Sequence, residues 1–255
     1  MRPLLLGGVR GDTVPVLREA SEYRGEAAIA VACTQLGPEY TSREAKRVLD
    51  EWIELLRAPT PLTDLQFTSR TPSRLFAALS GQPRLTRLVV KWGDYADLTP
   101  IAAMTGLRTL RLRGASAVGD VSPLRALEHL DLLTLEGFTT IDDPSPLANL
   151  RALRHLELGG KWMIPRNGHI TSIGFLRELR GLEHVLLHTL VVDDLDYSPL
   201  LELPRLRSVR VMKSEVCNRL TRSFALDFRG KREGARVHSF TKARRASSPA
   251  GRSTP

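Results

Sequence analysis

Several features are scarce in this 255-residue sequence, and each scarcity excludes a class of protein. It contains only two cysteines, Cys33 and Cys217, which excludes a disulfide-rich scaffold and a four-cysteine zinc site. The longest apolar runs, such as residues 27–33, are far shorter than the roughly 20 residues of a membrane-spanning helix. Residues 1–8 hold one arginine and three leucines, too few for a secretory signal. We therefore expect a cytoplasmic protein without a membrane partner.

The positive charge is concentrated at one end of the chain. The formal net charge is +9, which suggests a nucleic-acid partner. Residues 229–255 contain eight Lys or Arg residues and one acidic residue, so they contribute +7 of that charge. Ser, Gly, Ala and Pro fill most of the rest of this segment, which predicts a disordered basic tail. The remaining residues are close to neutral, so the total charge is weak evidence that they bind nucleic acid.

An apolar pattern, LxxLxL, recurs through the middle of the chain. Residues 107–112, 130–135 and 153–158 match it fully, and weaker copies begin at residues 62, 85, 182 and 206. The steps between successive starts are 23, 22, 23, 23, 29 and 24 residues. Repeats of this length indicate a solenoid, because a single unit cannot bury its apolar face without neighbours.

A second motif, D-x-[S/T]-P-[L/I], recurs in the same register. It begins at Asp97, Asp120, Asp143 and Asp196, and residues 172–176 occupy the missing place without the proline. We expect a helical turn at each copy, with Ser or Thr as the N-cap and Pro at the first helical position. The preceding Asp can accept backbone N–H bonds in the turn that leads into the helix.

Together, LxxLxL and the segment SPLANL at residues 145–150 resemble the bacterial leucine-rich-repeat family, of the internalin-like kind with 22–24 residues per repeat. The resemblance covers residues 58–213. It implies an α/β solenoid with a curved parallel sheet on the concave face and short helical segments outside. The family usually has Asn three residues after the last leucine of LxxLxL. The residues at that position are Arg70, Gly93, Ala115, Phe138, Lys161, Leu190 and Ser214. Other groups or water must therefore satisfy the turn backbone.

The sequence divides into three parts. Residues 1–57 form an N-terminal segment with an amphipathic helix at 41–57, which Thr41 and Glu44 begin as a capping box. We expect this helix to cap the solenoid, and residues 27–33 to be a short strand. Residues 58–214 form about seven repeats, with an insertion at residues 159–172 that is expected to bulge from a turn. Residues 215–255 form the C-terminal end and the basic tail.

The residues between the leucines of a strand are expected to face solvent on the concave surface. On this basis a basic cluster is predicted from Arg87, Lys91, Trp92, Arg111 and Arg113. Such a mixture of arginine and an aromatic ring is typical of binding hot spots. The alternative is a solvated face whose charges pair partly with Glu136 and Asp64.

A second patch is predicted from His155, Glu157, His184 and His188 on adjacent strands. These side chains could ligate a metal or perform acid–base chemistry. No metal motif of fixed spacing is present, so pH-sensitive contacts with a partner are the favoured role. The acidic residues at 193, 194 and 196 lack the Gly and terminal Glu of a calcium loop and indicate a solvated turn.

The sequence therefore predicts a protein–protein interaction module rather than an enzyme, with no metal and no cofactor. Its contacts are expected on the concave face, at both patches and at Glu136. The partner is a protein ligand. The alternative is association with nucleic acid through the basic tail and the patch of Arg87, Lys91, Arg111 and Arg113.

Overall fold

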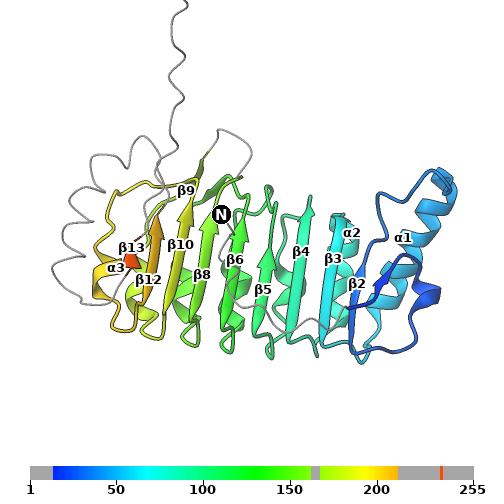
Figure 1. The fold of residues 1–255 in the computed structure, drawn as a ribbon, viewed down its shortest axis with the longest axis horizontal. Helices are drawn as coiled ribbons and strands as arrows, with labels where there is room; N and C mark the ends of the chain where they lie inside the picture. Colours follow the sequence, from blue (N-terminus) through cyan, green and yellow to red (C-terminus); the bar gives the residue numbers. More distant parts are fainter. Residues whose placement is uncertain (1–13, 162–166, 212–235, 238–255) are drawn as a thin grey trace, which may run out of the picture.

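Each repeat contributes one strand to a parallel sheet. The computed structural model describes residues 14–161, 167–211 and 236–237, and its main sheet has ten strands in the order β1-β2-β3-β4-β5-β6-β8-β10-β12-β13 (Figure 1). The bounds are β1 Val16–Leu17, β2 Ala28–Val31, β3 Asp64–Thr71, β4 Arg87–Gly93, β5 Thr109–Leu112, β6 Leu132–Glu136, β8 His155–Gly159, β10 His184–His188, β12 Ser208–Val211 and β13 Arg236–Val237. The seven predicted repeat strands run from β3 to β12, which confirms the parallel solenoid sheet.

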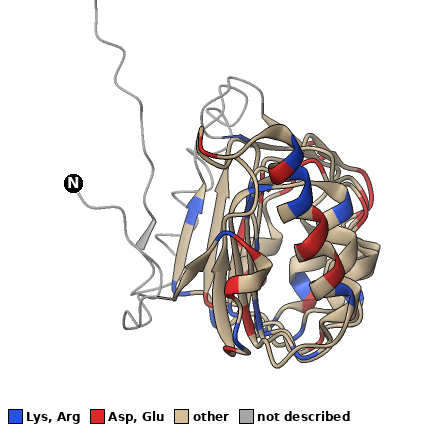
Figure 2. Cartoon of the chain, turned by 90° about the vertical axis from the view of Figure 1, so that its right-hand side faces the viewer, with Lys and Arg blue, Asp and Glu red and all other residues tan. Residues whose placement is uncertain are grey.

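Short helical segments form the second layer, on one side of the sheet (Figure 2). They are mostly 3₁₀ turns, because 22–24 residues leave little chain for a helix after the strand and two turns. Their bounds are α1 Ser42–Arg57, α2 Ser73–Ala77, η2 Ala78–Gly81, η3 Thr99–Ile101, η4 Ser122–Ala126, η5 Ser145–Asn149, η6 Gly174–Glu178 and α3 Pro199–Glu202. A further turn, η1 (Ala20–Glu22), lies near the N-terminal edge.

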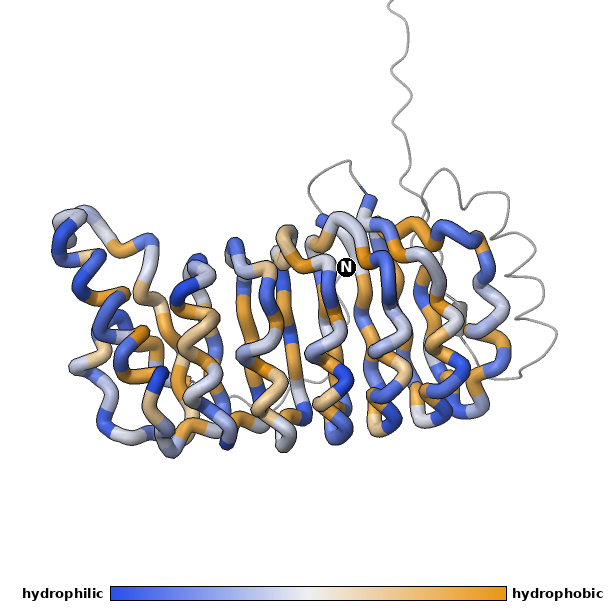
Figure 3. The backbone as a smooth tube through the Cα atoms, turned by 180° about the vertical axis from the view of Figure 1, so that it is seen from behind, coloured by the Kyte–Doolittle hydropathy of each residue, from blue (hydrophilic) through white to orange (hydrophobic). Residues whose placement is uncertain are grey.

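The leucines of the repeats form the core between the two layers. Leu110 and Leu112 are fully buried, and the equivalent leucines of the next repeats, Leu133, Leu135, Leu156 and Leu158, are at most 3% exposed. Seen from the helical side, hydrophobic segments recur from one repeat to the next (Figure 3). Burial of one such side chain stabilises the fold by about 1.5–3 kcal/mol, so the stacked leucines hold neighbouring repeats together.

The aspartates of the second motif, rather than Ser or Thr, cap the 3₁₀ turns. Asp97 accepts the backbone N–H of Thr99 at 2.8 Å, and Asp143 accepts that of Ser145 at 3.0 Å. Leu98 and Pro144 occupy the N-cap positions, and Thr99 and Ser145 are the first helical residues. The prediction of Ser or Thr N-caps is therefore wrong at η3, η4 and η5, whereas the prediction for Asp is confirmed. At the fourth copy Ser198 is the N-cap residue and Pro199 the first helical residue of α3, as predicted, although the Ser198 side chain makes no cap bond. Ser172 replaces Asp before η6, where its Oγ accepts the N–H of Gly174 at 3.0 Å.

Backbone bonds between neighbouring repeats replace the asparagine ladder. The N–H of Ala115 donates to the carbonyl of Glu136 at 2.9 Å, and the N–H of Gly137 donates to that of Gly159 at 2.8 Å. The ladder positions at Ala115 and Phe138 are buried. Apolar packing and direct backbone bonds thus take over the role that stacked Asn side chains have in the family.

The insertion belongs to a second, three-stranded parallel sheet that the repeat pattern does not predict. Its strands are β7 (Thr140–Ile141), β9 (Gly168–Ile170) and β11 (Leu190–Val192), in the order β11-β9-β7. Residues 162–166 of the insertion lie outside the described residues. Within the described part of the insertion, β9 pairs with strands of both neighbouring repeats, and the expected bulge stays a prediction.

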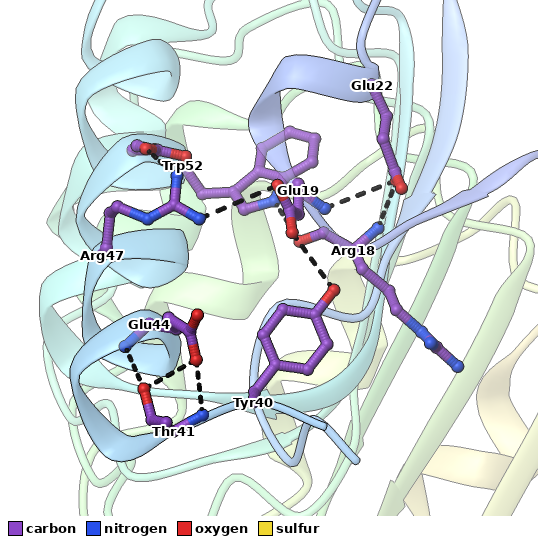
Figure 4. Close-up of polar contacts among 9 residues, drawn as sticks. Arg18, Glu19, Glu22, Tyr40, Thr41, Glu44, Arg47 and Trp52 are labelled. Carbon is purple, nitrogen blue, oxygen red and sulfur yellow. Dashed lines mark hydrogen bonds and ion pairs between the residues drawn. The ribbon is translucent and has the colours of Figure 1, made fainter. Parts of the chain in front are cut away.

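The N-terminal residues extend the sheet, and α1 crosses over from β2 to β3 (Figure 1). The predicted helix and its capping box are confirmed, because Thr41 Oγ1 accepts the N–H of Glu44 while the Glu44 carboxylate accepts the N–H of Thr41 (Figure 4). The buried Trp52 donates from Nε1 to the Arg18 carbonyl at 2.8 Å. This bond joins α1 to the chain beside β1. The role of α1 as a cap of the solenoid stays a prediction.

Most of the predicted basic tail lies outside the described residues, as does Cys217. Two of its residues, Arg236–Val237, form β13 and pair with β12. Among the described residues, no helix combines the length and the apolar character needed to cross a membrane.

Candidate functional site

The strand register places the predicted surface residues in rows across the sheet. We call the surface directed away from the helical layer the sheet face. The first row is Asp64, Arg87, Thr109, Leu132, His155, His184 and Ser208, and the second is Gln66, Val89, Arg111, Thr134, Glu157, Leu186 and Arg210. Both rows are paired as the LxxLxL alignment predicts. The third row is predicted to contain Thr68, Lys91, Arg113, Glu136, Gly159, His188 and Met212. In it Glu136 pairs with Gly159 and Gly159 pairs with His188, while Met212 lies outside the described residues.

Arg111 lies at the centre of the predicted basic cluster. It is half-buried, and its Nε finds no hydrogen-bond partner among the described residues. Burial lowers the pKa of Arg111, and the positive charges of Arg113 and Arg87 lower it further, against the opposing effect of Glu157. The guanidinium remains charged at pH 7. Because its Nε has no hydrogen-bond partner among the described residues, this positive charge is poorly compensated.

Acidic neighbours partly neutralise the flanking arginines. Arg87 forms an ion pair with Asp64 at 2.8 Å, and Arg113 lies 3.8 Å from Glu136. Both pairs are expected if this surface is a solvated face whose charges pair partly with Glu136 and Asp64, the alternative given by the sequence. They leave Arg111 as the arginine of the cluster with the weakest local compensation.

Lys91 and Trp92 lie at the end of β4, beyond the register shift between β3 and β4. Lys91 is exposed, whereas Trp92 is half-buried. A Cβ added to Gly114 would lie 2.7 Å from the Cβ of Trp92, so the absence of a side chain at Gly114 allows the two turns to approach. The adjacent strand, β5, carries Arg111 and is followed by Arg113, and the role of Lys91 and Trp92 in binding stays a prediction.

His155 and His184 stack on one another in the first row. Their ring centroids are 4.7 Å apart and the rings are nearly parallel, at 13°. Burial lowers the pKa of His184, and the neighbouring His155 lowers it further. His155 Nδ1 lies 4.0 Å from the carboxylate of Asp131, too far for a hydrogen bond. The lowered pKa keeps His184 largely neutral at pH 7, and the two stacked rings present an aromatic surface.

Glu136, Glu157 and His188 form a separate group, which we call the carboxylate–histidine triad. Their ligating atoms all lie within 4.8 Å of one another, and His188 Nε2 is 3.5 Å from Glu157 Oε1. Burial raises the pKa of Glu136. Burial also raises that of Glu157, but His188 and a hydrogen bond from Thr134 outweigh it, and the net effect is a lowered pKa.

His188 differs from its predicted environment, because its side chain is fully buried instead of facing solvent. Its paired residue in β8 is Gly159, and a Cβ there would collide with the ring and the carbonyl of His188. The missing side chain lets the imidazole lie over β8 and reach Glu157. The structure thus divides the predicted second patch into the stacked histidines and the carboxylate–histidine triad, and it adds Glu136 to the latter.

The acidic turn at residues 193–196 is engaged in structural contacts, and the Cys33 thiol is buried. Asp193 contacts His169 at 2.8 Å, and Asp194 accepts the backbone N–H of Asp196 at 2.9 Å, as in a polar turn. Burial raises the pKa of the Cys33 thiol to about 12, which leaves it protonated and unreactive at neutral pH.

Comparison with known proteins shows similarity at the level of the fold. No protein-family model and no curated protein matches the chain. An internalin C2 from Listeria monocytogenes is 22% identical over 74% of this chain and 75% of that protein, with a TM-score of 0.50. An internalin (inlF) from the same species is 22% identical over 63% of this chain and 58% of that one, with a TM-score of 0.38.

A third similar structure comes from a plant. It is the ectodomain of the receptor kinase GASSHO1/SCHENGEN3 from Arabidopsis thaliana in complex with CASPARIAN STRIP INTEGRITY FACTOR 2. It is 17% identical over 73% of this chain and 26% of that one, with a TM-score of 0.39. The repeat strands, the helical turns and the likeness to internalin C2 agree, and the chain has an internalin-like leucine-rich-repeat fold.

Proposed function

We propose that this chain binds a protein partner on the sheet face and catalyses no reaction. The fold supports this proposal, because a stacked solenoid presents a broad, rigid surface built from side chains of many strands. The residues proposed to contact the partner are the basic cluster of Arg87, Lys91, Trp92, Arg111 and Arg113, with the stacked pair of His155 and His184 beside it.

The observation that carries the proposal is the environment of Arg111. A half-buried guanidinium whose Nε has no hydrogen-bond partner among the described residues is poorly satisfied. Nε itself is buried, but a carboxylate of a partner could accept from the two terminal nitrogens at once, in the bidentate geometry that guanidinium groups favour. We therefore propose that the partner places an acidic side chain against Arg111.

Charge pairing favours a protein partner over a nucleic acid. Phosphate binding would use several uncompensated cations along one track. Here Arg87 is paired with Asp64, and Arg113 lies beside Glu136. The sheet face therefore offers one poorly compensated arginine between partly neutralised ones, an arrangement better suited to a single acidic anchor residue.

Capture by the immobilised full-length chain tests this proposal. Cell lysate is applied with and without nuclease treatment, over a series of salt concentrations, and retained proteins are identified by mass spectrometry. A specific protein that is retained after nuclease treatment supports the proposal. Retention that nuclease abolishes, and that falls steeply with salt for any duplex, supports the nucleic-acid alternative instead.

A further inference from the structure

We propose that Glu136, Glu157 and His188 form a binding site for a divalent first-row transition-metal ion such as Zn²⁺. The three residues come from the adjacent strands β6, β8 and β10, so the sheet backbone fixes their relative positions. This inference is independent of the proposed protein partner.

The spacing of the three side chains suits a small cation. Tetrahedral Zn²⁺ with bonds of about 2.1 Å requires its ligand atoms to be about 3.4 Å apart. His188 Nε2 and Glu157 Oε1 are 3.5 Å apart, close to that separation. All three ligating atoms lie within 4.8 Å of one another, so a rotation of the half-buried Glu136 side chain would complete a three-ligand set.

Two of the three side chains, those of His188 and Glu157, are also held through a second polar atom. His188 Nδ1 contacts Thr189 Oγ1 at 3.1 Å, which directs Nε2 toward the two carboxylates. Thr134 donates to Glu157 Oε2 at 3.1 Å, which leaves Oε1 on the side of His188. Outer contacts of this kind orient the ligands of metal sites and raise their affinity.

The donor chemistry selects the class of ion. One imidazole nitrogen and two carboxylate oxygens suit Zn²⁺, Fe²⁺ or Mn²⁺ better than Ca²⁺, which prefers oxygen ligands alone. An imidazole ligates a metal through a deprotonated nitrogen, so the two carboxylates would supply the negative charge that balances the ion. Arg113, which is about half exposed and 3.8 Å from Glu136, is the competing cation and can turn toward solvent when an ion binds.

Binding of Zn²⁺ to the untagged full-length chain, measured by calorimetry and by elemental analysis after dialysis, tests the proposal. We expect one ion per chain. At a free Zn²⁺ concentration about 100 times the dissociation constant, the melting temperature should rise by about 5–10 °C. Glu136→Gln and Glu157→Gln should each weaken binding by about 10-fold or more.

Two further variants make the test specific to these residues. His184→Asn, which alters a histidine of the same strand outside the triad, should leave the affinity unchanged. Arg113→Gln should tighten binding several-fold, because it removes the competing cation without touching a ligand. Because Glu136 is half-buried, Glu136→Gln is expected to fold, which a melting curve without metal verifies. Failure to bind one ion per chain would overturn the proposal, as would affinity that is insensitive to Glu136→Gln or lost in His184→Asn.

Discussion

The imidazole of His188 lies over Gly159, the residue directly paired with it in the neighbouring strand. Glycine is the only residue that leaves room for this arrangement, since a Cβ would meet both the ring and the carbonyl oxygen of His188. The burial of the His188 side chain from β10 therefore depends on the absence of a side chain at Gly159 in β8.

Gly159→Ala should destabilise the fold. The added methyl group must displace a buried ring and its backbone, and such overpacking costs about 1–3 kcal/mol. Urea denaturation followed by circular dichroism measures the change. Gly106→Ala is the matched control, because nothing lies within 4 Å of a Cβ at Gly106, and it should alter stability by less than about 0.5 kcal/mol. Equal stability of the two variants would contradict the packing of His188 over Gly159.

Thr134→Val should remove a hydrogen bond that stabilises the Glu157 carboxylate, with almost no change in side-chain volume. Thr134 is 1% exposed and donates to Glu157 Oε2, and loss of a hydrogen bond to a charged acceptor costs about 1.5–3 kcal/mol. The pKa of Glu157 should rise, which carboxyl chemical shifts in an NMR titration would detect. Thr109→Val, at a half-buried position of the same sheet face, is the control. An unchanged Glu157 pKa would refute the role assigned to Thr134.

The capping aspartates should make stability depend on pH in the acid range. Hydrogen bonds from the side chain and backbone of Thr99 lower the pKa of Asp97, and those of Ser145 do the same for Asp143. Because the folded pKa is below the unfolded value of 3.8, this stabilisation is present above pH 3.8 and is lost as the pH falls through the folded pKa.

A chain with Asp97→Asn and Asp143→Asn keeps a side-chain acceptor in both turns but cannot titrate there. Its unfolding free energy should therefore fall less steeply than that of the wild type below pH 3.8. Denaturation at a series of pH values makes the comparison. Identical acid slopes in the two proteins would show that these turns do not contribute.

Trp52→Phe should loosen the N-terminal edge of the sheet. The substitution retains an aromatic ring in the core but removes the hydrogen bond from Nε1 to the Arg18 carbonyl, at a cost of about 1 kcal/mol. Amide hydrogen exchange in β1 and β2 should accelerate more than exchange in β6. Uniform acceleration along the chain would instead indicate a general loss of stability, with no special link between α1 and the edge.

Much of the fold is predictable from the sequence because one apolar pattern is repeated. Leu110, Leu133 and Leu156 occupy equivalent places in LxxLxL, and the structure pairs them in that register. The second sheet is not predictable in this way. Its strands, such as β7 at Thr140–Ile141, have two or three residues, too few for alternation to be visible.

The sequence predicts the row of the sheet in which each candidate residue lies, but not the contacts that its side chain makes. The alignment places Arg111 and Glu157 in one row and His188 in the next, as the structure does. It cannot reveal that Gly159 allows His188 to cross its neighbouring strand, because the periodicity describes the direction of a side chain and not its length or rotamer. A glycine inside an otherwise regular row is the signal that could have indicated this contact.

The central claim is that Arg111 anchors an acidic group of a protein partner, and the affinity of the captured partner for Arg111→Ala tests it most directly. Arg125→Ala is the matched control, because Arg125 is exposed on η4 in the helical layer. With both variants folded, as shown by their melting curves, we expect Arg111→Ala to weaken binding by about 30-fold or more, as at an interface hot spot, and Arg125→Ala to leave it unchanged. Equal affinity of the two variants and the wild type would contradict the claim.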